Sequence, residues 1–505
     1  MTNKVTYRLF ALLLIFNVNF TVHAEDYSSY LVGDKVPNEL AYLPTPPDSM
    51  QIFSNGDYVR WIWGKSVRNT PRGEQASKDS KYGIIRMSAI YSDVLGIEIS
   101  EENTPAIYRF MVNSGYTGAM SVVAMKHAFF RKRPFMLMNE RLWSEWDTYE
   151  DLNNNSSYPS SHTSNGWGTA LALAEMAPHL QDTILRLGLE YGVSRVIVGA
   201  HWQSDVDAAM LTSSATIARA HATEKYIAHL NAAREEYAAL KGMTLAEIAS
   251  GNSPKANKIL DAPYLSDSQP FYGDVSHYWK AKTQRGGERG EKAIADANLD
   301  DDAIVSGFAP CADIPFSATE TPLITSLLKT LKERLMLDGR EMKDCWFRKR
   351  PYIQMNEPTS IPNEENLYRN ESSYPSVHAT IGWGIALVLA EVMPECQNSV
   401  LKRGYDFGWS RVITGYSYSS DVQAGRVMAA CLLAKYHNDP SFQSALEAAK
   451  QEYAQKKADQ GIEEIICHSS NTPGYWYSIS GIIYTSRPRV PGIYIHNGEK
   501  VKIGY

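Results

Sequence analysis

Cysteine is scarce in this chain of 505 residues, and the positions of its few cysteines exclude a familiar class of metal site. All five lie in the second half of the chain: Cys311, Cys345, Cys396, Cys431 and Cys467. No two of them have the C-x2-C spacing of a structural zinc site, so we expect no cysteine-ligated metal. Because five is an odd number, at least one cysteine has no partner within the chain, and the spacing alone assigns no pairing.

Long apolar runs are also lacking, except at the start of the chain. Residues 1–24 begin with Lys4 and Arg8, continue through an apolar stretch and end in Val-His-Ala before Glu25, a layout typical of a cleavable signal peptide. A buried N-terminal helix is the alternative. No other segment approaches about 18 consecutive apolar residues. We therefore expect an exported protein, periplasmic, secreted or on the cell surface, without stable membrane insertion.

Positive charge is not in excess either. The chain has 50 lysines and arginines against 56 aspartates and glutamates, a formal net charge of -6. Proteins that bind the phosphate backbone of nucleic acids present a basic surface. We therefore expect no nucleic-acid partner.

The chain repeats itself at an offset of 216 or 217 residues. The stretch "FRKRPF" (130–135) returns as "FRKRPY" (347–352), and "SSYPSSHTSNGWGTALALAEMAP" (156–178) returns as "SSYPSVHATIGWGIALVLAEVMP" (372–394). This period is far too long for a solenoid, and each copy has the length of an ordinary domain. The sequence predicts one domain at 25–250, a linker rich in Pro, Ser, Asn and Gly at 251–273, and a second domain at 274–460.

Within each copy the apolar residues recur at helical spacing. In the first copy such a run follows the "YPS" turn and ends at Pro178, a second covers 181–200, and a third, long run follows Asp205. Alternation of the kind found in strands is scarce. We predict an all-α protein of two tandem helical bundles. Whether it forms a homo-oligomer, or whether the two copies pack as a pseudo-dimer within one chain, stays open.

The composition changes after about residue 460. Residues 461–505 mix β-branched and aromatic residues with turn formers, which predicts a short β-rich tail. The final stretch "GIYIHNGEKVKI" resembles the terminal motif of type IX secretion sorting domains. The alternative is a small hairpin packed on the second domain.

Three clusters of polar residues in the first copy are not explained by helix packing. Lys126, Arg133 and Arg195 supply three cations, and the planar guanidinium groups match phosphate oxygens. Ser160, Ser161 and His162 open a helix, where backbone N–H groups attract an anion; the set is completed by His201 and Asp205. We expect these clusters to form a cradle for a phosphoryl group.

The two histidines supply the chemistry that such a cradle would need. His201 and Asp205 are spaced i, i+4, so the carboxylate can bond one ring nitrogen and leave the other as a nucleophile towards phosphorus. His162 can protonate the leaving oxygen and afterwards deprotonate the attacking water. The three cations offset the phosphoryl charge, so we expect neither a metal ion nor another cofactor.

The same clusters, read in order, give K-x6-R-P, P-S-x-H and S-R-x5-H-x3-D, and this order resembles the type 2 phosphatidic acid phosphatase superfamily. The stretches "WGKSVRNTPRGEQA" and "SYPSSHT" resemble its class A bacterial non-specific acid phosphatases. The resemblance implies hydrolysis of small phosphomonoesters at acid pH through a phosphohistidine. It also implies that His201 is the nucleophile, Asp205 its orienting group and His162 the general acid, and that phosphate is bound by Lys126, Arg133, Ser160, Ser161, His162 and Arg195. The family usually has Gly where Ser161 stands.

The second copy keeps most of these residues but lacks the histidine nucleophile. Six positions are retained, namely Lys343, Arg350, Ser376, His378, Arg411 and Asp421, but Ser417 stands at the position of the nucleophile and Val377 in the turn. A serine needs a base or a metal ion before it attacks phosphorus. We predict that the second copy is a degenerate, catalytically silent domain, and leave open whether it binds phosphate.

Other interpretations of the same residues stay open. The "RKR" at 131–133 can be a solvated basic patch, and His127 and Asp207 match no motif position and are predicted to be structural. At the level of function, the alternatives are a lipid phosphate phosphatase, a vanadium haloperoxidase, and a non-catalytic phosphate-binding surface protein.

Overall fold

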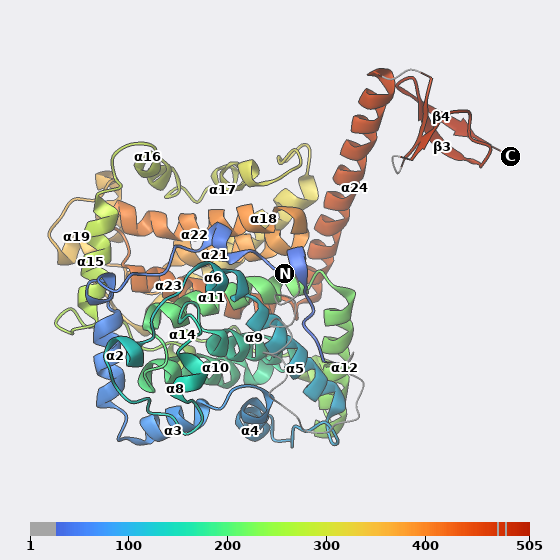
Figure 1. Cartoon of the computed structure of the whole chain (residues 1–505). Coiled ribbons are helices and arrows are strands. Elements are labelled where there is room, and N and C mark those ends of the chain that lie inside the picture. Colours follow the sequence, from blue (N-terminus) through green and yellow to red (C-terminus); the bar gives the residue numbers. More distant parts are fainter. Residues whose placement is uncertain (1–26, 472–473, 480–481, 505) are drawn as a thin grey trace, which may run out of the picture.

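The computed structural model describes residues 27–471, 474–479 and 482–504, and these residues are mostly helical with one small sheet near the C-terminus (Figure 1). The expectation of an all-α protein with a β-rich tail is confirmed. The expected signal peptide, residues 1–24, lies outside the described residues. None of the helices in the described part is long and apolar enough to cross a membrane.

The helices fall into two series of matching order, with the 3-10 helices written η. The first series is η2 (Gly33–Lys35), α1 (Glu39–Tyr42), η3 (Gln51–Phe53), α2 (Asp57–Ser66), α3 (Pro71–Asp79), α4 (Ile84–Leu95), α5 (Pro105–Met120), α6 (Val123–Ala128), α7 (Pro134–Leu137), α8 (Tyr149–Leu152), α9 (Ser161–Met176), η4 (Pro178–Leu180), α10 (Gln181–Ile197), α11 (Gln203–Ala220), α12 (Glu224–Lys241) and α13 (Leu245–Ala249). The second series is α14 (Ala256–Ile259), α15 (Phe271–Lys282), α16 (Glu288–Ala295), α17 (Asp301–Phe308), η5 (Ala309–Cys311), α18 (Pro322–Glu341), η6 (Met342–Cys345), α19 (Pro351–Gln354), η7 (Pro362–Glu364), α20 (Glu365–Tyr368), α21 (Val377–Val392), η8 (Pro394–Cys396), α22 (Gln397–Thr414), α23 (Ser419–Tyr436) and α24 (Pro440–Asn471).

The helix after the "YPS" turn forms the centre of each copy. In the first copy α9 packs against α5, α10 and α11, and nearly all of its residues are buried. Glycines permit this close approach, because a Cβ at Gly166 would lie 2.3 Å from the ring of Tyr191. In the second copy a Cβ at Gly382 of α21 would lie 2.5 Å from Phe407. The duplicated "GWG" is therefore a packing requirement of the central helix.

The two copies share one hydrophobic core. The first copy forms the lower half of the molecule in Figure 1 and the second copy the upper half, and α11 and α23 meet in the middle. Helix α11 of the first copy packs on α21, and its counterpart α23 packs on α9. This reciprocal packing of equivalent helices is that of a dimer with an approximate two-fold axis, built here within a single chain.

A segment precedes each helical bundle, and we call it the arm of that copy. Each arm lies across the other copy. The first arm carries α1, which packs on α22, and Asn38 N donates to Asn398 Oδ1 at 2.8 Å. The second arm carries α14, which packs on α10, and Lys255 N donates to Asp182 Oδ1 at 3.0 Å. Because the two contacts join equivalent positions, the arms are exchanged between the copies. Part of the predicted linker at 251–273 is thus an ordered component of the interface, and it also contains the start of α15.

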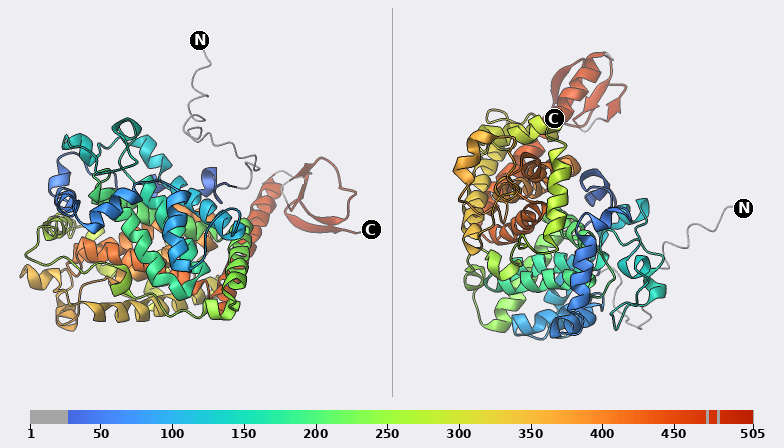
Figure 2. Two further views of the ribbon diagram at one scale, coloured as in Figure 1. Left: turned by 90° about the horizontal axis from the view of Figure 1, so that it is seen from below. Right: turned by 90° about the vertical axis from the view of Figure 1, so that its left-hand side faces the viewer.

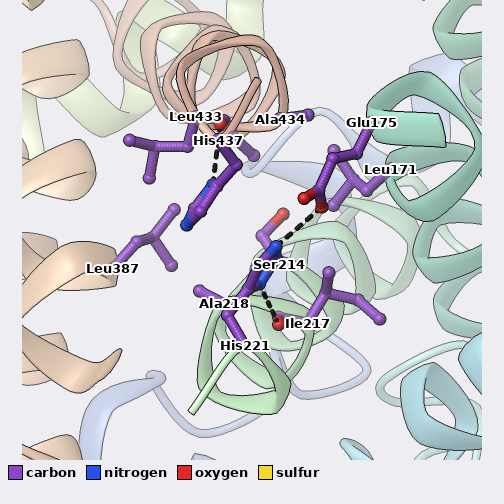
Figure 3. A pocket seen from close by; sticks show the side chains of 11 residues that line it. Leu171, Glu175, Ser214, Ile217, Ala218, His221, Leu387, Leu433, Ala434 and His437 are labelled. Carbon is purple, nitrogen blue, oxygen red and sulfur yellow. Dashed lines mark hydrogen bonds and ion pairs between the residues drawn. The ribbon is translucent and has the colours of Figure 1, made fainter. Parts of the chain in front are cut away.

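A cluster of ionisable side chains lies where the two copies meet (Figure 3). The rings of His221 and His437, which are equivalent residues, stack with centroids 3.9 Å apart. His221 Nε2 lies 2.6 Å from the carboxylate of Glu175, and His437 Nε2 lies 2.9 Å from that of Glu391. Arg234 and Lys450 approach the two carboxylates from α12 and α24. The charges are therefore paired within each copy, and the stacked histidine rings join the two sets of pairs across the interface.

This cluster predicts that the protein is most stable in mildly acid solution. Burial would raise the pKa of Glu175, but His221 outweighs burial and the pKa falls to about 2; burial would lower the pKa of His221, but Glu175 outweighs it and the pKa rises. The glutamate contributes stability above its unfolded pKa, near 4.5, and the histidine contributes stability below 6.5, which is lost as the pH rises through its raised pKa.

The free energy of unfolding should therefore fall as the pH rises above 6.5, by about 1.4 kcal/mol for each unit by which folding raises the pKa of His221. Guanidinium chloride unfolding between pH 5 and pH 8 would measure this. In His221→Gln the fall should shrink, whereas the exposed histidine variant His127→Gln should behave as the parent. An equal pH dependence in all three proteins would contradict the prediction.

The C-terminal end of the chain extends away from the helical body (Figures 1 and 2). Helix α24 continues past residue 460, where the sequence predicted the start of the β-rich tail, and ends at Asn471. The residues before 460 are rich in the helix formers Ala, Gln, Glu and Lys, and a helix that is already formed is extended at little cost. The strands β1 (Trp476–Ser478), β2 (Ile483–Tyr484), β3 (Gly492–His496) and β4 (Glu499–Ile503) form an antiparallel sheet of order β2-β1-β3-β4. Asn497 and Gly498, both at positive φ, make the turn between β3 and β4. The sheet packs on α24.

Of the cysteine side chains that the structure describes, Cys311, Cys345, Cys396 and Cys431 are free thiols. The side chain of Cys467 lies outside the described part.

Candidate active site

The turn between α10 and α11 places His201. Gly199 has a φ of +82°, a conformation that favours glycine, and it reverses the chain directly after the helix. The backbone N–H groups of Ala200 and His201 then donate to the carbonyl of Arg195, both at 3.1 Å. This turn brings the guanidinium-bearing end of α10 and the imidazole of His201 into one site.

The hydrogen bonds of His201 assign its tautomer. Arg133 Nη1 lies 2.8 Å from His201 Nε2, and a guanidinium only donates, so Nε2 carries the lone pair. The proton then sits on Nδ1, which lies 3.4 Å from the Asp205 carboxylate. Burial, followed by the charges of Arg133 and Lys126, lowers the pKa of His201 well below its usual value. His201 is therefore a neutral imidazole whose free electron pair faces a cationic group.

The cations of the cradle gather around a few backbone carbonyls. Lys126 Nζ and Arg133 Nη2 both donate to the carbonyl of Ser156, and Arg133 Nη1 also donates to Ala200 O at 2.9 Å. Arg133 is buried, and burial together with Arg195 lowers its pKa to about 10. Mutual repulsion within this group favours the binding of an anion.

The N-terminus of α9 positions His162. Ser160 is the N-cap, and its hydroxyl accepts from Thr163 N at 3.2 Å, so this side chain shapes the turn that presents Ser161 and His162. His162 Nε2 lies 2.8 Å from the carbonyl of Asp79, which only accepts, so Nε2 carries a proton. The ring stacks on Tyr191 with centroids 4.2 Å apart. The nitrogen that can gain and lose a proton is therefore Nδ1.

The charged groups near His162 are Arg195 and Asp147, which form an ion pair with each other. Arg195 Nη1 donates to Asp147 Oδ2 at 2.7 Å, and both side chains are largely buried. Burial, and then Arg195, lowers the pKa of His162 well below its usual value, while Asp147 opposes this fall. Asp147 was not among the residues predicted from the sequence, because no motif places it beside Arg195.

Asp205 was predicted to bind His201, but it makes closer contacts with three other residues. Its carboxylate accepts from Trp202 N at 2.8 Å, from Ser157 Oγ and from Arg131 Nη1, while His201 Nδ1 stays at 3.4 Å. Asp205 is thus the end of a buried network, and its contact with the imidazole is the weakest one it makes.

Arg131 joins this network to the start of the first helical bundle. It donates through Nη2 to Asp57 Oδ2 at 2.7 Å and is only 6% exposed. The interpretation of "RKR" as a solvated basic patch is therefore wrong for Arg131 and Arg133, and only Lys132 between them is exposed. A signal was present in the sequence, since both Arg131 and Asp57 recur in the second copy, as Arg348 and Asp274.

The second copy reproduces the frame without the nucleophile. Arg348 bridges Asp274 and Asp421, Lys343 Nζ donates to Ser372 O at 2.6 Å, and Arg350 Nη1 donates to Tyr416 O at 3.0 Å. The ring nitrogen Nε2 of His378 lies 3.1 Å from Ala297 O. At the position of His201 stands Ser417, whose hydroxyl donates to Ser376 Oγ at 3.5 Å.

The best group of potential metal ligands in the described part of the chain lies elsewhere, at the interface between the copies. His221, Glu391 and His437 have ligand atoms within 4.8 Å of one another. The two imidazoles stack nearly parallel, at 20°, and a metal ion lies in the plane of each imidazole that binds it, so the two rings do not point at one ion. Their Nε2 atoms face carboxylates instead. This geometry fits an ion-pair cluster.

Comparison with known proteins identifies the family of the chain. The PAP2 superfamily model matches residues 108–227 and 322–443, one match in each copy. A non-specific acid phosphatase of Providencia stuartii is 38% identical over 213 residues, which cover 42% of this chain and 86% of that protein. The chain belongs to the PAP2 superfamily.

Two further relatives place the chain among the non-specific acid phosphatases of the PAP2 superfamily. A non-specific acid phosphatase of Salmonella typhimurium is 33% identical over 237 residues, covering 46% of this chain and 92% of that protein. An acid phosphatase of Zymomonas mobilis is 32% identical over 208 residues, covering 41% of this chain and 79% of that protein. Each relative corresponds to less than half of this chain, as expected when one PAP2 domain occurs twice. The resemblance inferred from the motifs is confirmed.

Proposed function

We propose that the protein is an exported acid phosphatase that hydrolyses small organic phosphomonoesters at the site around His201, without a metal ion. One observation carries the proposal, namely that the lone pair of His201 Nε2 lies among the cations Lys126, Arg133 and Arg195. A neutral imidazole nitrogen attacks phosphorus, and the cations offset the charge on the phosphoryl oxygens. The names of the three relatives support this activity.

In the first step His201 Nε2 attacks phosphorus and forms a nitrogen–phosphorus bond. Arg133 Nη1, which donates to Nε2 in the structure, would then donate to a phosphoryl oxygen. The bond from phosphorus to the ester oxygen breaks, and the departing oxygen takes the proton from His162 Nδ1. The product of this step is a phosphohistidine and a free alcohol.

In the second step a water molecule attacks the phosphohistidine. His162 Nδ1, now without its proton, accepts one from the water, the nitrogen–phosphorus bond breaks, and inorganic phosphate leaves. The network of Arg131, Asp57 and Asp205 acts as a positioning group, since Asp205 holds the turn that carries His201. Both histidines thus return to their starting states.

This mechanism implies an acid optimum and a role for Asp147. His162 must carry a proton on Nδ1, and its pKa is held well below the usual value by burial and then by Arg195. Asp147 opposes this fall, so Asp147→Asn should lower the pKa of His162 further. The alkaline limb of the profile of kcat/KM against pH should therefore move to lower pH.

The exposed aspartate Asp151, which lies in the first turn of α8 and accepts from the hydroxyl of the N-cap residue Thr148, offers a control for this measurement. Asp151→Asn should leave the alkaline limb where it is in the parent protein. If Asp147→Asn also leaves it unmoved, Asp147 does not tune His162.

The activity is tested by phosphate release from a panel of soluble phosphomonoesters between pH 4 and pH 8 in the presence of a chelator. We expect turnover that is fastest at acid pH and survives chelation; release that requires a divalent cation would contradict the proposal. Phosphatidic acid in detergent is included for comparison, and faster hydrolysis of this lipid would identify a lipid phosphate phosphatase. Halide oxidation that appears only with added vanadate would identify a haloperoxidase.

The same proposal makes the second copy catalytically silent. Ser417 has Ser376 as its hydroxyl partner, and Asp421, four residues away, is occupied by Arg348 and by Tyr418 N. A serine without a base is a poor nucleophile. The second copy therefore stabilises the first through the shared core and the exchanged arms.

Export is proposed from the two ends of the chain. Residues 1–24 have the layout of a signal peptide, and the hairpin of β3 and β4 contains the stretch that resembles a type IX sorting motif. Deletion of residues 1–24 should retain the protein in the cytoplasm, whereas truncation before β1 should alter only its final location. An unchanged distribution between cell fractions after both deletions would contradict export by these signals.

A further inference from the structure

The second copy contains a cavity of about 60 Å³ at the position that corresponds to the site of the first copy. Six of the residues that line it are counterparts of the residues around His201: Lys343, Arg350, Ser376, His378, Arg411 and Ser417. A buried water needs about 10–15 Å³ of such space, so the cavity has room for a group several times larger. Ser417 is smaller than the histidine at the equivalent position of the first copy, which leaves space in the middle of the site.

The charges in this cavity are not balanced. In the first copy Arg195 is paired with Asp147, but its counterpart Arg411 makes no ion pair with a carboxylate in the described part of the chain. Arg411 is 2% exposed, its Nη1 has no hydrogen-bond partner, and its guanidinium faces the ring of Tyr416 at 4.3 Å. Glu371, the acid nearest to Arg350, is 3.7 Å away with a side chain that is 56% exposed.

A buried guanidinium without a partner is costly, and proteins retain such groups where a ligand supplies the missing charge. The cavity also adjoins the N-terminus of α21, a helix of 16 residues whose first N–H groups attract an anion. Burial and Arg350 lower the pKa of Lys343 to about 7 and that of Arg411 to about 10, and an anion would raise both.

We infer that this cavity is a binding site for a tetrahedral oxyanion of the size and charge of phosphate, which it holds without hydrolysis. Arg411, Arg350 and Lys343 pair with the oxyanion, and the hydroxyl of Ser417 donates to it. The oxyanion is either free phosphate or the phosphoryl end of a monoester. The inference does not depend on the activity of the first copy, because it rests on the second cavity alone.

The test counts phosphate ions bound per chain. Equilibrium dialysis with radiolabelled inorganic phosphate, at low ionic strength and pH 6, is carried out on the full chain and three methionine variants. We expect two ions per chain in the parent protein, one in Arg411→Met and one in Arg195→Met. Lys402→Met, which removes an exposed charge from the same helix as Arg411, is the matched control and should bind two.

The first site serves as an internal control for folding, since Arg411→Met that still binds one phosphate is folded. A single site in the parent at about 10 mM phosphate, with an unchanged count in Arg411→Met, would overturn the inference. Phenylphosphonate, whose carbon–phosphorus bond is not hydrolysed, separates the two sources: displacement of both ions shows that the second cavity also accepts the phosphoryl end of an ester. If the parent protein binds two phosphate ions per chain but releases no phosphate from any monoester, the proposed function is wrong and this inference still holds.

Discussion

His201→Ala is expected to lower the rate of phosphate release by about 10⁴-fold or more, in the range seen when a covalent nucleophile is removed. The reason is local. The variant has no nitrogen lone pair in the cradle, while Lys126, Arg133 and Arg195 still bind the phosphoryl group. The loss should therefore appear in kcat, with KM changing little. Initial rates with a soluble phosphomonoester at the optimal pH of the parent protein measure it.

The duplication offers a matched control for this variant. Ser417→Ala changes the equivalent position of the second copy and should leave the rate of phosphate release as in the parent protein. An equal loss in Ser417→Ala would show that the second copy takes part in catalysis. A fully active His201→Ala would remove the basis of the phosphohistidine mechanism and show that phosphate is released by a different group.

Arg131→Met is expected to lower the free energy of unfolding by about 3–5 kcal/mol, because it leaves the buried carboxylates of Asp57 and Asp205 without their cation. The side chains of all three residues are almost fully buried, so water cannot compensate. The variant should also lose activity per folded molecule, because Asp205 anchors the turn that holds His201. Denaturant unfolding and the rate at a temperature where the variant is folded measure the two effects separately.

The second copy again supplies the control. Arg348 makes the same two ion pairs, with Asp274 and Asp421, so Arg348→Met should be destabilised to a similar extent. It should keep the activity of the parent protein while it is folded. If Arg131→Met loses stability but retains its full rate, the network is structural in both copies and does not position His201.

The sequence predicted the parts of the site that lie close together along the chain. Spacing alone grouped Arg195, His201 and Asp205, because one helix end and one turn connect them. The helix N-terminus before His162 was also predictable, since Pro and Ser precede an apolar run. The catalytic and binding roles of these residues stay predictions, while their convergence around the His201 imidazole is a property of the structure.

The partners of these residues could not be predicted, because they come from distant segments. Arg131 contacts Asp57, which lies 74 residues before it in the chain, and Asp205, which lies 74 residues after it. Asp147, which contacts Arg195, lies in a loop 48 residues before it. Spacing rules hold only within an element, where geometry fixes which side chains share a face. A surface-like "RKR" therefore concealed two buried arginines.

Four features were predictable from the amino-acid sequence: the two helical copies, the order of the motifs, the replacement of His201 by Ser417 and the change to strands near the end. These follow from local rules of periodicity and turn chemistry, and from the comparison of the chain with itself. Three features emerged only from the folded chain: the stacking of His221 on His437, the exchanged arms, and the lack of an ion pair for Arg411 among the described residues. These features depend on contacts between the two copies, such as those of His221 with His437 and of Asn38 with Asn398, and packing of whole helices decides which contacts are made.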